Sequence, residues 1–285
     1  MAKILIAGCG DIGMRLATRL VEKGHVVTGL RRKPVAPPHP ALKMLSADMT
    51  VSHRLQALDD DFDYVVFLAA PDARDETQYR AVYETALGHL LTHFSKRASP
   101  PRWIFVSSTR VYGESQGEWV EESTPAQPKD VTGQLLYSAE QRVRSQDAGN
   151  IVVRFSGIYG PGRRRLLRLA KAGASAQRRP PYYTNRIHQE DCAGVLDFLL
   201  KARISGRTLE DCYLASDDAP APMFEVLSWL AGRMGGPQPA VRPAGAEPVQ
   251  NKRCRNDRLK ALGYVFRYPS YREGYLPLID ANTNL

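Results

Sequence analysis

Short, nearly continuous apolar runs recur along the first half of the chain and alternate with longer segments of helical periodicity. Because these runs are apolar throughout, we predict strands that are buried on both faces of a sheet. Between the first two runs, Ile12, Leu16 and Leu20 fall on one side of a helix predicted over residues 11–23. A second such helix is predicted over residues 78–94. This alternation predicts an α/β fold with a doubly wound parallel sheet and helices on both faces. The apolar runs are residues 3–7, 25–30, 63–70, 102–108 and 150–156.

The pattern becomes less regular after residue 156. Glycine, proline and arginine follow one another in GIYGPGRRR, and residues 235–249 form a proline-rich connection. We therefore expect a first domain over residues 1–157 and a smaller lobe that takes up most of residues 158–285. A strand and helices within about 187–216 are expected to return to the main sheet. The further elements predicted are helices at 192–200, 223–234 and 255–264 and a strand at 211–216.

Composition narrows the class of protein. Four cysteines lie far apart among 285 residues, which favours neither a disulfide framework nor a zinc site, and no other metal site is expected. No apolar run approaches ~20 residues, so no membrane span is expected, and the first residues do not resemble a signal peptide. We expect a cytoplasmic protein. The net charge of +9 comes from basic residues spread along the chain, which favours small anionic ligands over nucleic acid.

The segment GCGDIG, residues 8–13, follows a predicted strand and opens a predicted helix. In a dinucleotide-binding turn, Gly8 permits the tight bend, Gly10 lets a pyrophosphate approach the backbone and Gly13 lets the helix pack on the sheet. The phosphates would lie at the helix start, beside Asp11 and Ile12. The sequence therefore predicts a Rossmann-type domain that binds a dinucleotide cofactor.

The end of the second predicted strand indicates which cofactor. An acidic residue there would bind the ribose 2′-hydroxyl of NAD, but this chain has Arg31 and Arg32. A guanidinium group suits the 2′-phosphate of NADP, which a carboxylate would repel. We therefore predict NADP, with NAD less favoured. The alternative is that both arginines belong to a solvated loop edge.

Several motifs together resemble an extended short-chain dehydrogenase/reductase of the NAD-dependent epimerase/dehydratase type, in particular an atypical subgroup. The resemblance covers nearly the whole chain and implies a Rossmann fold with a C-terminal substrate lobe, a sugar-like, nucleotide-linked substrate and a possible homodimer. It also implies that Asp48 and Met49 lie near the adenosine, and that Ala69, Ala70 and Ser107 lie along the cofactor. The glycine spacing departs from the more usual GxxGxxG. The motifs, besides GCGDIG, are SAD at 46–48, FLAA at 67–70, VSSTRVYG at 106–113, RFSGIYGPG at 154–162 and NRIHQED at 185–191.

Ser108 occupies the place where the family carries the hydroxyl that binds the reacting oxygen. At the carboxyl end of a central strand, such a hydroxyl can polarise a carbonyl over the cofactor crevice. The family's acid/base pair is a tyrosine with a lysine four residues later, and two alignments are open here. In the first, Tyr137 is the tyrosine and Gln141 replaces the lysine. The second keeps a glycine and a glutamate in register and puts Thr132 and Leu136 at the two places, so the usual pair is missing.

Two classes of function follow from these patterns. The first is an NADP-dependent oxidoreductase or epimerase that transfers hydride to and from a sugar-like substrate. The second is a catalytically degenerate NADP-binding protein with a regulatory or scaffold role. Arg163, Arg164 and Arg165 could clamp a substrate diphosphate or form a solvated charged face.

Overall fold

The computed structural model describes residues 1–33, 35–244 and 250–283. The last part of the proline-rich connection, residues 245–249, lies outside the described residues, as does residue 34. The chain forms two compact units, each made of several segments. The first unit comprises Met1–Val111, Pro128–Arg154 and Ala193–Tyr213, and the second comprises Tyr112–Gln127, Phe155–Cys192 and Leu214–Leu285. Residues 112–127, which we expected in the first domain, lie in the second unit.

A seven-stranded sheet forms the centre of the first unit, in the order β12-β7-β5-β4-β1-β2-β3. Neighbouring strands from β3 to β5 pair in parallel, which confirms the predicted Rossmann-type fold. Ile4, Leu5 and Ile6 of the central strand β1 are fully buried, as the continuous apolar run predicted. The strands are β1 (Lys3–Ala7), β2 (Val26–Arg31), β3 (Lys43–Ser46), β4 (Tyr64–Phe67), β5 (Arg102–Ser108), β7 (Ile151–Phe155) and β12 (Cys212–Ala215).

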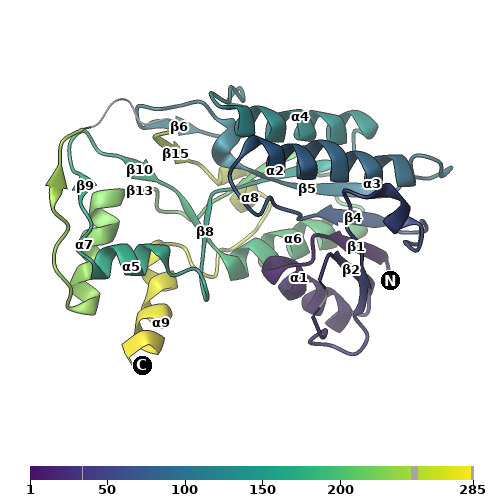
Figure 1. The fold of residues 1–285 in the computed structure, drawn as a ribbon, viewed down its shortest axis with the longest axis horizontal. Helices are drawn as coiled ribbons and strands as arrows, with labels where there is room; N and C mark the ends of the chain where they lie inside the picture. Colours follow the sequence, from purple (N-terminus) through teal and green to yellow (C-terminus); the bar gives the residue numbers. More distant parts are fainter. Residues whose placement is uncertain (34, 245–249, 284–285) are drawn as a thin grey trace. The chain divides into compact units, whose positions relative to one another are not determined.

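Helices cover both faces of this sheet (Figure 1). On one face lie α1 (Asp11–Glu22) and α6 (Gln189–Ile204), which are tied by an ion pair between Lys23 and Asp197. On the other face lie α2 (Glu76–Arg80), α3 (Leu87–Phe94) and α4 (Val131–Gln146). β12 lies at the edge of this sheet, beside β7, so the chain reaches the sheet again late in the sequence.

The helix predicted over residues 78–94 is wound less regularly than expected. It begins as α2 (Glu76–Arg80), widens into a π-helical segment over Ala81–Ala86 and continues as α3 (Leu87–Phe94). The Arg142 guanidinium, from α4, donates to the carbonyl oxygen of Glu84 at 3.1 Å, within the widened segment. A Cβ at Gly88 would lie 3.0 Å from the same guanidinium. A side chain from another helix therefore binds the backbone of the widened turn.

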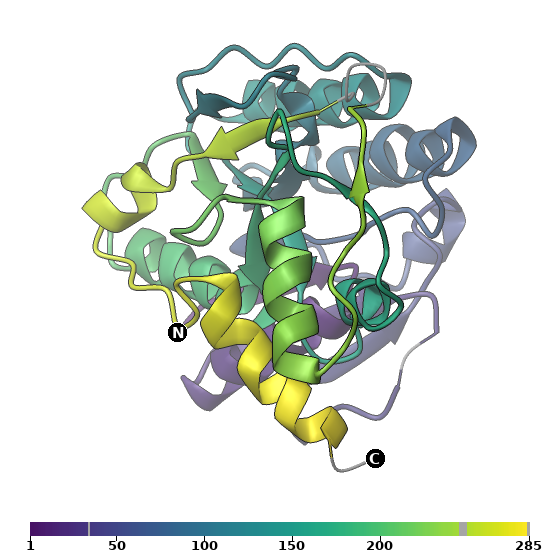
Figure 2. The ribbon, with the colours of Figure 1, turned by 90° about the vertical axis from the view of Figure 1, so that its left-hand side faces the viewer.

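The second unit is built from small ribbons and helices. Its core lies where α5 (Arg165–Lys171), α7 (Met223–Met234) and α9 (Tyr271–Thr283) meet, and Figure 2 shows α7 and α9 side by side. The predicted helix at 223–234 is confirmed as α7, and the one at 255–264 is the shorter α8 (Asp257–Ala261). The ribbons pair β6 (Glu118–Val120) with β15 (Lys252–Cys254), β8 (Gly157–Tyr159) with β11 (Arg186–His188), β9 (Ala176–Gln177) with β14 (Val241–Arg242), and β10 (Tyr183–Thr184) with β13 (Ala221–Pro222).

Within the described ranges, no helix is both long and apolar enough to cross a membrane. The same part of the chain contains no cluster of three or more side chains suited to hold a metal ion. All four cysteines are buried thiols.

Candidate functional site

The turn between β1 and α1 has the backbone geometry that a pyrophosphate-binding loop requires. Gly8 has φ +90°, and a Cβ there would lie 2.3 Å from the backbone nitrogen of Ala69, so only glycine fits. Gly10 has an ordinary φ of −85°, but a Cβ there would meet nothing nearer than the Gly8 carbonyl oxygen at 4.0 Å. A glycine at position 10 therefore leaves open space beside the start of α1.

The start of α1 suits an anionic group. No side chain caps this helix, and backbone N–H groups of a first turn have no partner inside the helix. Gly13 lets the helix approach β1, because a Cβ there would lie 3.2 Å from Ile6 Cγ2 and 3.5 Å from Cys9 Sγ. Burial raises the pKa of the Cys9 thiol to about 11, so this cysteine packs beneath the turn as an unreactive thiol. The predicted glycines thus form a cradle into which a dinucleotide pyrophosphate fits.

Arg31 and Arg32 lie at the end of β2, where the adenosine end of such a cofactor is expected. Arg31 pairs in register with Ser46 of β3. The Arg32 guanidinium contacts both carboxylate oxygens of Asp72, at 2.9 and 2.6 Å. Asp72 was not among the residues predicted from the sequence, since nothing in its local pattern marks it as a partner of a residue forty positions earlier.

Asp48 and Met49 follow β3 at the same edge of the sheet. Asp48 accepts hydrogen bonds from the backbone N–H and the hydroxyl of Thr50, at 2.9 and 2.6 Å. The hydroxyl is the main cause of the lowered pKa of Asp48, so the carboxylate is charged at neutral pH. The Met49 carbonyl oxygen lies 2.9 Å from His89 Nδ1. These contacts fix the loop that would border an adenine.

Ser107 and Ser108 end β5 but differ in their surroundings. The Ser107 hydroxyl donates to Glu140 at 2.5 Å, and Glu140 forms a buried ion pair with Arg154 at 2.6 Å. The Ser107 hydroxyl is therefore already hydrogen-bonded in the interior of the first unit. Ser108 is half-buried, and its Oγ accepts the Arg110 backbone N–H at 3.2 Å. That bond uses an acceptor position of Ser108 and leaves its hydroxyl proton available to a substrate oxygen.

Thr132 lies in a hydrogen-bonded cluster at the start of α4. Its hydroxyl donates to the Asp130 carboxylate at 2.5 Å and accepts from Arg110 Nε at 2.8 Å. Arg110 also forms an ion pair with Asp130 at 3.0 Å. Arg110 was not among the predicted site residues, although it stands in the VSSTRVYG segment; its contacts with Asp130 and Thr132 cross 20 and 22 positions of the chain.

Tyr137 lies further along α4 and is half-buried. In the described part of the chain its hydroxyl makes no hydrogen bond, and the Arg142 guanidinium, bound to the carbonyl of Glu84, does not take the place of a lysine beside it. Leu136 is buried at 2% exposure, so the position that the second alignment gives to the lysine is apolar. Among the residues that the structure describes, neither the Tyr137 nor the Thr132 hydroxyl has an ammonium group as its partner.

Comparisons with known proteins place these features in context. The model of the "NAD dependent epimerase/dehydratase family" matches residues 4–206. Protein YeeZ of Escherichia coli strain K12 is 30% identical over 94% of this chain and 97% of its own length. The 3-diazoavenalumate denitrifying reductase of a Streptomyces species is 27% identical over 95% and 98% of the two chains. A solved epimerase/dehydratase structure from Methylobacillus flagellatus has a TM-score of 0.81 and 36% identity, and covers 99% of both chains.

Proposed function

Because the chain belongs to the NAD-dependent epimerase/dehydratase family, we propose that it is an NADP-dependent oxidoreductase that works as a reductase of a carbonyl-like substrate. The observation that carries this proposal is the glycine turn at the start of α1, with open space at Gly10 and no capping side chain. Backbone N–H groups and the helix dipole bind a pyrophosphate there. Arg31 and Arg32 supply guanidinium groups for a 2′-phosphate, which supports NADP over NAD.

The surroundings of the hydroxyl groups support reduction as the direction in which the site is used at neutral pH. Oxidation of an alcohol needs a base, and a tyrosine becomes one near neutral pH when an ammonium group lowers its pKa. Here Gln141 or Leu136 stands where that ammonium would be. Reduction needs a hydrogen-bond donor at the substrate oxygen and a source of a proton, which uncharged hydroxyls provide. The Streptomyces relative, named as a reductase, supports the same direction.

When bound, the cofactor supplies the hydride. Ser108 donates its hydroxyl proton in a hydrogen bond to the substrate oxygen and polarises the carbonyl, and Tyr137 or a water molecule delivers the proton that completes the alcohol. Thr132 holds Arg110 and Asp130 in place at the start of α4. The sugar-like, nucleotide-linked substrate implied by the family resemblance stays a prediction.

A second candidate is a cofactor-binding protein without turnover. Two features of the second alignment favour it. Leu136, at the place of the usual lysine, is buried, and the Thr132 hydroxyl, at the place of the usual tyrosine, is already hydrogen-bonded to Arg110. Such a protein would bind NADPH and gain stability from it but would not consume it.

The test combines binding with turnover. We expect the protein to bind NADPH by calorimetry and to oxidise it in the presence of some member of a panel of aldehydes, ketones and nucleotide-linked keto sugars. Ser108→Ala should keep the NADPH affinity and lose roughly 100-fold or more in turnover, since one hydrogen bond to a developing oxyanion is removed. Ser145→Ala, on the outer side of α4, is the control. Binding without turnover would favour the second candidate, and absence of binding would contradict both.

A further inference from the structure

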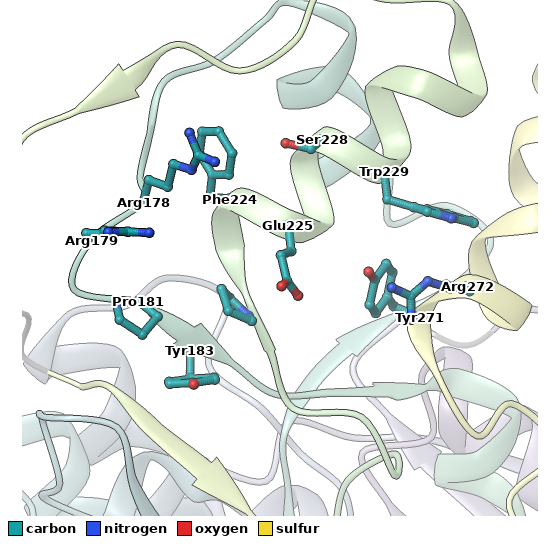
Figure 3. A pocket seen from close by; sticks show the side chains of 11 residues that line it. Arg178, Arg179, Pro181, Tyr183, Phe224, Glu225, Ser228, Trp229, Tyr271 and Arg272 are labelled. Atoms are coloured by element: carbon teal, nitrogen blue, oxygen red, sulfur yellow. The ribbon is translucent and has the colours of Figure 1, made fainter.

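A pocket of about 800 Å³ lies wholly within the second unit (Figure 3). One wall is the loop after β9, with Arg178 and Arg179, and the opposite wall is the start of α9, with Tyr271 and Arg272. The first turns of α7 lie between them, and Glu225 extends from α7 into the space between the walls. None of these residues belongs to the candidate cofactor site.

Three arginines line the pocket without carboxylate partners. In the described part of the chain, Arg178, Arg179 and Arg272 form no ion pair. The Arg178 guanidinium lies 5.5 Å from the ring centre of Phe224, and that of Arg272 lies 4.8 Å from the ring centre of Tyr271. A guanidinium stacked on a ring keeps its N–H edge directed outward, where it can bind an anion.

The start of α7 adds to this positive potential. The helix begins at Met223 after Pro222, and no side chain caps it. The positive end of the dipole of this twelve-residue helix therefore lies at the pocket, beside Phe224 and Glu225. An anionic group placed between the arginine wall and this helix start would be favoured by both.

Tyr271 supplies an independent sign of a ligand. Its side chain is 1% exposed, and its hydroxyl has no hydrogen-bond partner within the described residues. Figure 3 shows this hydroxyl on the side of the ring that faces Glu225. An unpartnered buried hydroxyl costs free energy, and a polar group of a bound molecule would remove that cost.

The lining also restricts the shape and charge of the ligand. Phe224, Trp229, Tyr183 and Tyr271 present rings to the pocket, which favours a planar aromatic group. The Glu225 carboxylate would repel a polyphosphate but can accept a hydrogen bond from a phenol. A ligand with one negative charge at one end and a hydroxyl on an aromatic ring would therefore match the side chains that line the pocket.

We propose that this pocket binds a hydroxylated aromatic carboxylate, with its carboxylate at Arg178 and Arg179 and its ring hydroxyl at Glu225 and Tyr271. The inference goes beyond the proposed reductase, because it concerns the second unit alone and does not depend on a cofactor. It also differs from the nucleotide-linked substrate that the family resemblance implies.

Calorimetry on the full chain tests the proposal with four probes. These are 4-hydroxycinnamate, cinnamate without the hydroxyl, 4-methylphenol without the carboxylate, and uridine diphosphate. We expect 4-hydroxycinnamate to bind most tightly. Arg178→Gln combined with Arg179→Gln should weaken it about tenfold or more, because two charge-assisted hydrogen bonds are lost. Tyr271→Phe should weaken 4-hydroxycinnamate several-fold and leave cinnamate unchanged.

A matched control carries the same change of charge outside the pocket. Arg164→Gln combined with Arg165→Gln, at the start of α5, should leave 4-hydroxycinnamate binding unchanged. An unchanged circular dichroism spectrum and melting temperature show that each variant is folded, and this control holds whether or not the protein binds NADPH. The proposal is overturned if 4-hydroxycinnamate gives no heat at millimolar concentration, if uridine diphosphate binds more tightly, or if the pocket variants bind like the control.

Discussion

Arg31 and Arg32 follow each other at the end of β2, but only Arg32 forms an ion pair within the described residues, with Asp72. A 2′-phosphate would therefore find Arg31 free to bind and Arg32 shared with a carboxylate. We expect Arg31→Ala to raise the Kd for NADPH about 10- to 100-fold, the range for losing a hydrogen bond between charged groups. The Kd for NADH should change little. Calorimetry with both nucleotides measures the difference, and an unchanged NADPH affinity would contradict the role of Arg31.

A substitution of Asp72, the partner of Arg32, should have the opposite effect on NADPH affinity. Asp72→Asn should tighten NADPH binding about two- to fivefold, because it removes a negative charge near the phosphate and releases Arg32. Asp60→Asn, an exposed aspartate on another loop, is the control for a change of net charge alone. If both variants shift the affinity equally, only the overall charge matters.

Asp217 is a buried carboxyl group of the second unit. Burial raises its pKa to about 8, although Arg186 opposes the shift, and its Oδ2 has no hydrogen-bond partner among the described residues. Its pKa in the unfolded chain is about 4. Between these values the folded state holds a proton that the unfolded state has lost, so this group lowers stability as pH rises from about 4 to about 8.

Asp217→Asn should remove this loss of stability at rising pH. We expect the variant and the parent to unfold at similar temperatures near pH 4.5, and the variant to be more stable near pH 8 by about 2 kcal/mol or more. Asp218→Asn is the neighbouring control, since Asp218 instead pairs with Lys260 at 3.2 Å and should gain nothing. Thermal unfolding followed by circular dichroism across this pH range makes the comparison. A difference that does not depend on pH would refute the assignment.

At the scale of single elements, two glycines of the turn between β1 and α1 should have different roles. We expect Gly8 to be needed for stability and Gly10 for binding the cofactor. Gly8 has a positive φ and touches the backbone of Ala69, so Gly8→Ala should destabilise the first unit strongly. Gly10 has an ordinary φ and open space around it, so Gly10→Ala should change stability by less than about 1 kcal/mol.

The same Gly10→Ala variant should nevertheless lose NADPH affinity by about tenfold or more, because its methyl group occupies the approach to the pyrophosphate. Thermal unfolding with and without NADPH reports both properties in one experiment. A variant that folds and binds NADPH like the parent would show that the pyrophosphate does not lie at this turn.

The elements differ in how far their structure could be predicted from the sequence. The central strands were predictable because a strand buried on both faces must be apolar at successive positions, as in β1. The glycine turn was predictable because its three glycines follow a recognisable spacing within six consecutive residues, between a strand and a helix. The widened helical segment was not predicted, and the side chain that binds its backbone, Arg142, comes from another helix that packs beside Gly88. Asp72 and Arg110 were missed for the same reason, since their partners are brought near only by the tertiary fold.

At the scale of the whole molecule, the order of strands makes the first unit depend on residues late in the chain. β12 lies next to β7, and Val152 N–H donates to the Asp211 carbonyl oxygen at 2.9 Å. All five residues of β7 are buried. A fragment of residues 1–157 would lose β12 and α6, and so would expose an apolar strand with unpaired backbone groups.

We therefore expect the fragment of residues 1–157 to aggregate, even though it contains every predicted cofactor-binding residue. A fragment of residues 1–216 keeps β12 and α6, and should yield more soluble monomer in size-exclusion chromatography and a larger thermal shift with NADPH. The comparison is informative because the two fragments share the whole glycine turn and differ in whether the sheet is complete. A monomeric 1–157 fragment that binds NADPH as tightly as the full chain would show that β7 tolerates a free edge and that the first domain ends where the sequence pattern changes.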